Sequence, residues 1–139
     1  MDSRKKILIV DDNQDIRLGM QVRLKANQYD TFFAADAVSG VAEVLKHLPD
    51  LIILDLGLPG GDGFTVMERL NKIPTLAVIP IIVVSARDVI GNQKRAYEAG
   101  AKAFLQKPVN DAELLAVIRQ SLAEAEETKK FTLRDEGSV

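Results

Sequence analysis

Five polar residues whose side chains can handle phosphate or a metal ion each stand directly after a short apolar run. They are Asp11 and Asp12 after residues 7–10, Asp55 after 51–54, Ser85 after 79–84, and Lys107 after 103–106. Carboxylates bind hard cations such as Mg²⁺, and an ammonium group pairs with phosphate or carboxylate as a point charge. This set can therefore hold a divalent ion and a phosphoryl group, provided that the fold brings the five side chains together.

The apolar runs are of strand length and do not alternate with polar residues. Ile7 to Val10, Leu51 to Leu54 and Ile79 to Val84 are rich in Ile and Val, as is typical of strands buried on both faces of a parallel sheet. The weaker runs 31–35 and 103–106 are predicted as edge strands.

Between these runs, apolar residues recur at helical spacing. The four stripes are Ile16, Met20 and Leu24; Val38, Val41, Ala42 and Leu45; Phe64, Met67 and Leu70; and Leu114, Leu115, Ile118 and Leu122. A weaker helix over 89–99 ends before Gly100, and Pro108 with Asn110 marks the start of the last helix. Five strands alternating with five helices predict an α/β sandwich with a parallel sheet and right-handed crossovers.

The three aspartates are expected to meet. Open α/β sheets bind ligands beyond the carboxyl ends of their strands, where the strand order reverses, and for the order 2-1-3-4-5 this lies between the first and third strands. Adjacent strands are roughly 4.8 Å apart, so Asp11, Asp12 and Asp55 should converge and repel one another unless a cation such as Mg²⁺ compensates. Lys107 starts two strands away, roughly 10 Å by the same spacing, but its long stem can reach back.

Simpler interpretations exist for each residue alone. Asp11 or Asp12 can cap the following helix, and we expect one of them to do so. Asp55 and Asp62 can be turn residues, and a single serine says little. The joint placement of these groups at four strand ends is what favours a common site.

Composition limits the classes of protein to consider. The 139 residues suit one soluble domain, with 47% hydrophobic and 27% charged residues. A net charge of −2 gives no basis for direct nucleic acid binding, and the absence of cysteine excludes thiolate sites and suits the cytoplasm. No apolar run is long enough for a membrane span or a signal peptide. We expect a domain over residues 1–125 and a charged C-terminal tail or linker over 126–139, where the helical stripe ends.

Four segments together closely resemble the response regulator receiver family of two-component signal transduction, with chemotaxis-regulator-like proteins among its members. They are Asp11-Asp12, the segment 54–63 around Asp55, Val84-Ser85-Ala86, and 104–108 ending in Lys107-Pro108. The likeness spans about residues 5–125. It implies a flavodoxin-like (βα)5 three-layer sandwich with a parallel five-stranded sheet of order 2-1-3-4-5.

The resemblance also implies a role for each site residue. Asp55 would be the phosphoacceptor, Asp11 and Asp12 would bind Mg²⁺ with Asp55 and the Gly57 backbone carbonyl, and Ser85 and Lys107 would contact the acyl phosphate. Phe104 would be a switch aromatic together with Ser85, although simple edge-strand packing also explains it. Arg87, long and charged, can reach the phosphate or a partner.

The resemblance implies that the chain is a phosphoacceptor rather than an enzyme, one that takes part only in its own phosphotransfer and autodephosphorylation. Its partner would be a sensor histidine kinase or a phosphotransfer protein, and its output a partner or a downstream effector domain. A homodimer through the last two helices and the strand between them is left open. Three alternatives remain. An aspartate phosphatase is disfavoured because Gly57 stands where that chemistry needs a second carboxylate as general acid, and a flavin- or nucleotide-binding module is disfavoured because the first loop is acidic. The third is a degenerate receiver that binds partners without phosphorylation.

Overall fold

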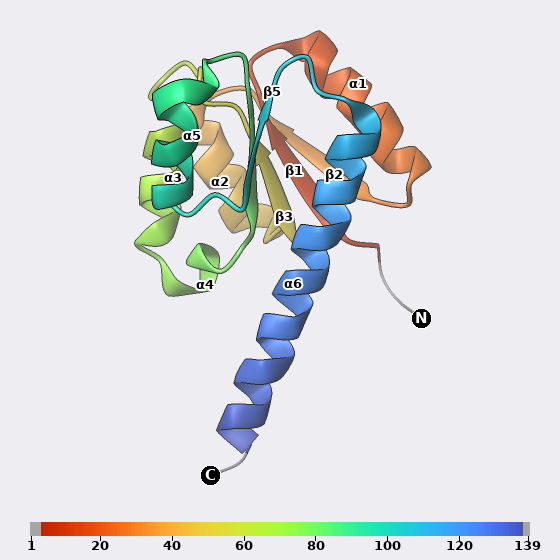
Figure 1. Ribbon diagram of the computed structural model, residues 1–139, viewed down its shortest axis with the longest axis vertical. Coiled ribbons are helices and arrows are strands. Elements are labelled where there is room, and N and C mark those ends of the chain that lie inside the picture. Colours follow the sequence, from red (N-terminus) through yellow and green to blue (C-terminus); the bar gives the residue numbers. More distant parts are fainter. Residues whose placement is uncertain (1–3, 138–139) are drawn as a thin grey trace.

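The computed structural model describes residues 4–137, with side chains to Lys130, and is built around a parallel five-stranded sheet (Figure 1). The strands are β1 (Lys6–Val10), β2 (Asp30–Ala34), β3 (Leu51–Leu54), β4 (Ile81–Ser85) and β5 (Ala103–Gln106). Their order is β2-β1-β3-β4-β5, as predicted. Every residue of β3 and β4 is buried, which explains why these segments carry no polar alternation.

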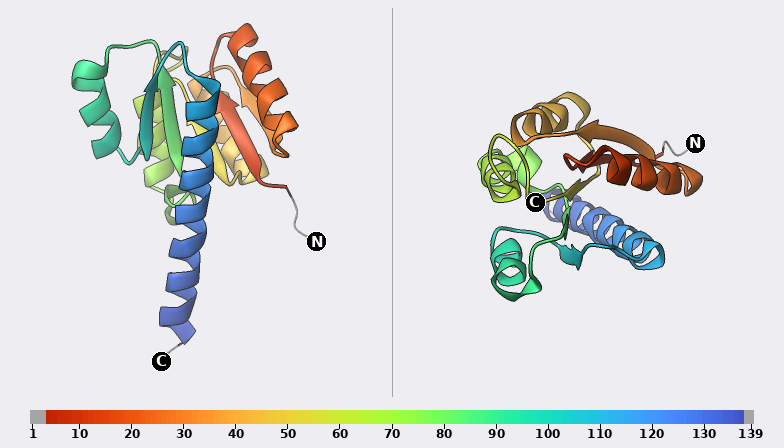
Figure 2. Two further views of the ribbon diagram at one scale, coloured as in Figure 1. Left: turned by 45° about the vertical axis from the view of Figure 1, so that its right-hand side comes forward. Right: turned by 90° about the horizontal axis from the view of Figure 1, so that it is seen from above.

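Helices cover both faces of the sheet, giving three layers (Figures 1 and 2). They are α1 (Gln14–Ala26), α2 (Ala37–His47), α3 (Gly63–Asn71), α4 (Pro74–Ala77), α5 (Val89–Glu98) and α6 (Asp111–Gly137). Alternate strand residues pack into two cores: Ile7 and Ile9 face α1 and α6, whereas Leu8 and Val10 face the other helices. The sandwich architecture is confirmed.

Two details of the helical layer differ from the sequence-based expectation. The one-turn helix α4 was not predicted, because four residues are too few to show a stripe. In α2, Val38 and Leu45 are more than half exposed, and the small residues Ala37 and Gly40 face the sheet instead. A Cβ at Gly40 would lie 3.2 Å from a Val10 methyl carbon, so α2 packs against β1 through its smallest residues.

The C-terminal helix is longer than expected. The prediction that the helix ends near residue 125 is wrong, since α6 continues to Gly137 and projects beyond the sheet (Figure 1). Two contacts are made along this extension: Lys5 pairs with Glu126 at 2.6 Å, and the hydroxyl of Thr128 donates to the Glu124 carbonyl. The last two residues of the expected tail lie outside the described part of the chain. Within residues 4–137, no helix is both long and apolar enough to cross a membrane.

Candidate functional site

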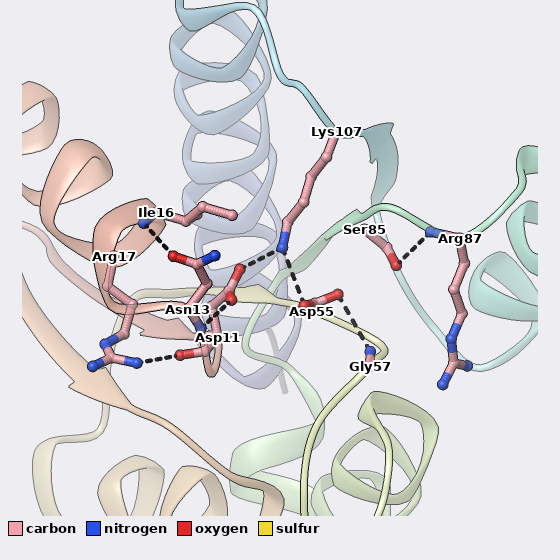
Figure 3. Close-up of polar contacts among 9 residues, drawn as sticks. All are labelled: Asp11, Asn13, Ile16, Arg17, Asp55, Gly57, Ser85, Arg87 and Lys107. Carbon is pink, nitrogen blue, oxygen red and sulfur yellow. Dashed lines mark hydrogen bonds and ion pairs between the residues drawn. The ribbon is translucent and has the colours of Figure 1, made fainter.

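Three carboxylates meet at the carboxyl edge of the sheet, where β1 and β3 end (Figure 3). One carboxylate oxygen each from Asp11, Asp12 and Asp55 lies within 4.8 Å of the other two. Asp11 and Asp55 are buried, at 3% and 7% exposure, whereas Asp12 is exposed. The cluster therefore has two shielded members and one that faces solvent.

Lys107 reaches this cluster from the end of β5, which lies two strands from β3 in the sheet. Its Nζ donates to Asp11 Oδ2 at 2.7 Å and to Asp55 Oδ2 at 3.1 Å, so the ammonium bridges β1 and β3 (Figure 3). Burial alone lowers the pKa of Lys107, but the hydrogen bonds and negative charges of Asp11 and Asp55 outweigh it, and the net pKa is raised. Lys107 is therefore charged at neutral pH. The peptide bond between Lys107 and Pro108 is cis.

The first loop holds Asp11 from two sides. Asp11 Oδ1 accepts a hydrogen bond from the Asn13 backbone N–H at 2.9 Å, and Arg17 Nη1 donates to the Asp11 backbone carbonyl at 2.7 Å. The prediction that Asp11 or Asp12 caps the next helix is wrong. Asn13 caps α1 by accepting from the Ile16 N–H, because it is the residue directly before the first turn. Both aspartates are thus left for the site.

The loop after β3 fits tightly under Asp55. Asp55 Oδ1 accepts from the Gly57 N–H at 3.3 Å, and Gly63 begins α3 directly against this loop. A Cβ at Gly63 would lie 2.5 Å from the Asp55 backbone carbonyl oxygen and 2.9 Å from Leu56 Cα. A side chain at residue 63 would therefore displace the backbone that carries Asp55.

Ser85 and Phe104 stand on the neighbouring strands. Ser85 is fully buried at the end of β4, and its Oγ accepts from the Arg87 backbone N–H at 3.2 Å. In Figure 3, Ser85 lies on the side of Asp55 away from Asp11. Phe104, on β5, is 7% exposed and belongs to the core beneath α3 and α5. Its burial is compatible both with simple packing and with a switch role.

The site suits a divalent cation. Three carboxylates and one ammonium sum to a formal charge of −3 + 1 = −2, and every carboxylate donor is a hard oxygen of the kind that Mg²⁺ prefers. Gly57 is exposed, and its backbone N–H donates to Asp55 Oδ1, so its main chain borders the carboxylate cluster. The residues present therefore fit the predicted ion, with Asp11, Asp12, Asp55 and the Gly57 carbonyl as the candidate ligands.

Comparison with known proteins identifies the family. The profile described as "Response regulator receiver domain" matches residues 7–119, which is most of the chain and includes every site residue described above. The chain belongs to the response regulator receiver domain family. This receiver domain is 39% identical over 115 residues to the response regulator PleD of Caulobacter vibrioides, covering 82% of the chain and 25% of PleD.

Other relatives agree with this assignment. The KDP operon transcriptional regulatory protein KdpE of Escherichia coli is 39% identical over 116 residues, which cover 84% of the chain and 50% of KdpE. The crystal structure of a CheY-like receiver domain protein from Methanospirillum hungatei superposes with a TM-score of 0.85 at 32% identity, covering 91% of this chain and 99% of that one. The receiver domain thus spans a quarter of PleD and half of KdpE.

Some residues around the site were not anticipated from the sequence. Arg17 and Gly63 act on the main chain of Asp11 and Asp55, and nothing in their residue types reveals such contacts beforehand. The prediction that Arg87 can reach the phosphate or a partner stays a prediction; in the unmodified domain its guanidinium pairs with Asp62 at 3.7 Å. That pair joins two loops that are far apart in the sequence and becomes visible only in the fold.

Proposed function

We propose that this receiver domain accepts a phosphoryl group on Asp55 from a phosphohistidine of a sensor histidine kinase or a phosphotransfer protein, in a Mg²⁺-dependent reaction. The resulting change of conformation controls a partner or a downstream effector domain. The observation that carries this proposal is the Lys107 ammonium, which lies between Asp11 and Asp55 in a cluster of three carboxylates. Curated relatives that extend well beyond the matched region support an effector outside this domain.

The chain's own residues divide the work of phosphoryl transfer. A carboxylate oxygen of Asp55 attacks phosphorus in line, forming the acyl phosphate O–P bond as the donor's N–P bond breaks and the imidazole leaves. Lys107 neutralises charge on the transferred oxygens, and the Ser85 hydroxyl donates a hydrogen bond to one of them. A bound Mg²⁺, held by Asp11, Asp12, Asp55 and the Gly57 carbonyl, would supply further charge neutralisation.

Several residues must share the conformational switch. Converting a 1:99 population to 99:1 requires about 5.5 kcal/mol of differential stabilisation, whereas one charge-assisted hydrogen bond contributes roughly 1.5–3 kcal/mol. A hydrogen bond to Ser85 alone is therefore too weak. Repacking of Phe104 and the new contacts of Lys107 must add to it, or the bound partner supplies the remainder.

Incubation with acetyl phosphate and Mg²⁺, followed by intact-protein mass measurement, tests this function. Wild-type protein should gain one phosphoryl group, and the gain should vanish in Asp55→Asn or when EDTA removes divalent ions. Asp15→Asn, an exposed carboxylate in the first turn of α1, is the matched control and should be modified like wild type. Unmodified wild-type protein that still binds a cognate partner would instead favour the phosphorylation-independent interaction module.

A domain boundary near residue 125 remains part of this proposal. We infer that residues 1–125 form the receiver and that 126–139 link it to the output region, with α6 as the continuous element between them. The receiver would act as a phosphoacceptor whose only chemistry is its own phosphorylation and dephosphorylation. Truncation after residue 125 should then leave the mass gain from acetyl phosphate intact.

A further inference from the structure

An ion pair joins the two loops that flank Asp55. Asp62 ends the loop after β3, and Arg87 stands two residues beyond Ser85 in the loop after β4. Arg87 Nη1 lies 3.7 Å from Asp62 Oδ2, with the two side chains 38% and 32% exposed. In Figure 3 the Arg87 side chain extends away from the Asp55 carboxylate. A guanidinium group is thus held next to the carboxylate cluster but outside it.

The two oxygens of Asp62 have separate partners. Oδ1 accepts from the Thr65 backbone N–H at 3.2 Å and caps α3, whereas Oδ2 faces Arg87. Asparagine caps helices about as well as aspartate, because its carbonyl oxygen accepts the same hydrogen bond. The negative charge of Asp62 is therefore not required for the cap, and its effect on Arg87 can be isolated.

The ion pair between Asp62 and Arg87 is weak enough for Arg87 to exchange Asp62 for another anion. A single contact at 3.7 Å between partly exposed groups is weak and screened by solvent. A phosphoryl group on Asp55 would offer three acceptor oxygens and more negative charge, which a planar guanidinium can bind in bidentate fashion. Because Leu54 pairs with Val83 across β3 and β4, Asp55 and Arg87 follow neighbouring strands at the same edge of the sheet. An arginine side chain is long and flexible enough to turn from one such loop toward the other.

On the basis of the proposed function, we propose that Arg87 is a phosphoryl-binding residue that Asp62 restrains until Asp55 carries a phosphoryl group. In the unmodified domain, the Asp62 carboxylate holds the Arg87 guanidinium outside the Asp11–Asp12–Asp55 cluster. The negative charge of the cluster is then available to the divalent ion. After phosphorylation, Arg87 exchanges Asp62 for the phosphoryl oxygens. Asp62 thereby sets how strongly the site holds its phosphoryl group.

A double-mutant cycle with a phosphoryl analogue tests the exchange. Beryllium trifluoride, titrated in the presence of Mg²⁺ at about 0.15 M salt and followed by NMR, gives an apparent Kd for wild type, Asp62→Asn, Arg87→Gln and the double variant. Asp62→Asn should bind the anion about fivefold more tightly when Arg87 is present, and less than twofold more tightly in the Arg87→Gln background. Arg87→Gln should weaken binding at least fivefold, and Arg87→Lys should recover part of that loss. Far-UV circular dichroism verifies that α3 and the fold survive in each variant.

The results separate this inference from the proposed function. Equal effects of Asp62→Asn with and without Arg87, or an Arg87→Gln variant that binds as tightly as wild type, would overturn the exchange. Wild-type protein that neither binds beryllium trifluoride nor gains mass from acetyl phosphate would instead refute phosphorylation of Asp55 itself. A larger effect of Asp62→Asn on the apparent Kd when Arg87 is present than in the Arg87→Gln background would support the exchange.

Discussion

Replacing Lys107 with methionine should destabilise the receiver domain through charge rather than packing. The substitution keeps most of the apolar stem but leaves the Asp11 and Asp55 carboxylates, with side chains 4% and 10% exposed, without their shared ammonium. Breaking a buried ion pair by removing one partner costs about 3–5 kcal/mol. Since Asp12 opens the cluster to solvent, we expect the lower end of this range, about 3 kcal/mol.

Urea denaturation followed by circular dichroism in EDTA measures this loss. Lys94→Met is the matched control, because the Lys94 side chain is 85% exposed and pairs only loosely with Glu98, so its loss should stay within about 0.5 kcal/mol. Adding Mg²⁺ should restore more stability to Lys107→Met than to wild type, since the variant's cluster retains three uncompensated carboxylates. A Lys107→Met variant as stable as Lys94→Met in EDTA would refute the electrostatic reasoning.

Three further predictions follow from single contacts. Gly63→Ala should lower the free energy of unfolding by about 1–3 kcal/mol and slow phosphorylation of Asp55, because its Cβ would clash with the Asp55 carbonyl. The control Gly19→Ala, whose Cβ meets open space, should be neutral or stabilising, and equal urea midpoints for the two variants would contradict this. Thr31→Val should stabilise by about 1 kcal/mol, because the buried Thr31 hydroxyl has no hydrogen-bond partner within the described residues; a lower thermal midpoint would count against it. The raised pKa of Lys107 means that its stabilisation is complete below the unfolded pKa of about 10.4 and is lost as pH rises through the folded pKa. The difference in unfolding free energy between wild type and Lys107→Met should therefore narrow as pH rises through that alkaline range, and a difference that stays constant there would be inconsistent with this cause.

The strands and the convergence of the site were predictable because burial and topology leave direct marks in the sequence. Leu51 to Leu54 and Ala103 to Gln106 are strands with the predicted bounds, since runs buried on both faces need no polar alternation. Lys107 lies over Asp55 because parallel strands end at one edge and a lysine stem spans the remaining gap. These consequences depend on residue type and order alone.

The remaining features depend on how closely neighbouring elements approach. The buried face of α2 could not be predicted from apolar spacing, because close packing on Val10 favours Gly40 over the larger Val38. The extension of α6 past residue 125 carries no apolar stripe, so periodicity does not predict it, and the contact of Lys5 with Glu126 joins residues that are distant in sequence. Asn13 rather than Asp11 or Asp12 caps α1 because the first turn begins one or two residues later than expected, and the pattern of residues does not define a helix start that finely.

Borohydride trapping of the phosphorylated protein tests the central assignment most directly. An acyl phosphate on an aspartate is reduced to homoserine, so peptide mass mapping after treatment with acetyl phosphate and Mg²⁺ reads out the modified position. The structure predicts homoserine at residue 55 alone, with Asp11 and Asp12 recovered unchanged. Homoserine at another aspartate, or phosphorylated protein that keeps an intact Asp55, would contradict the account.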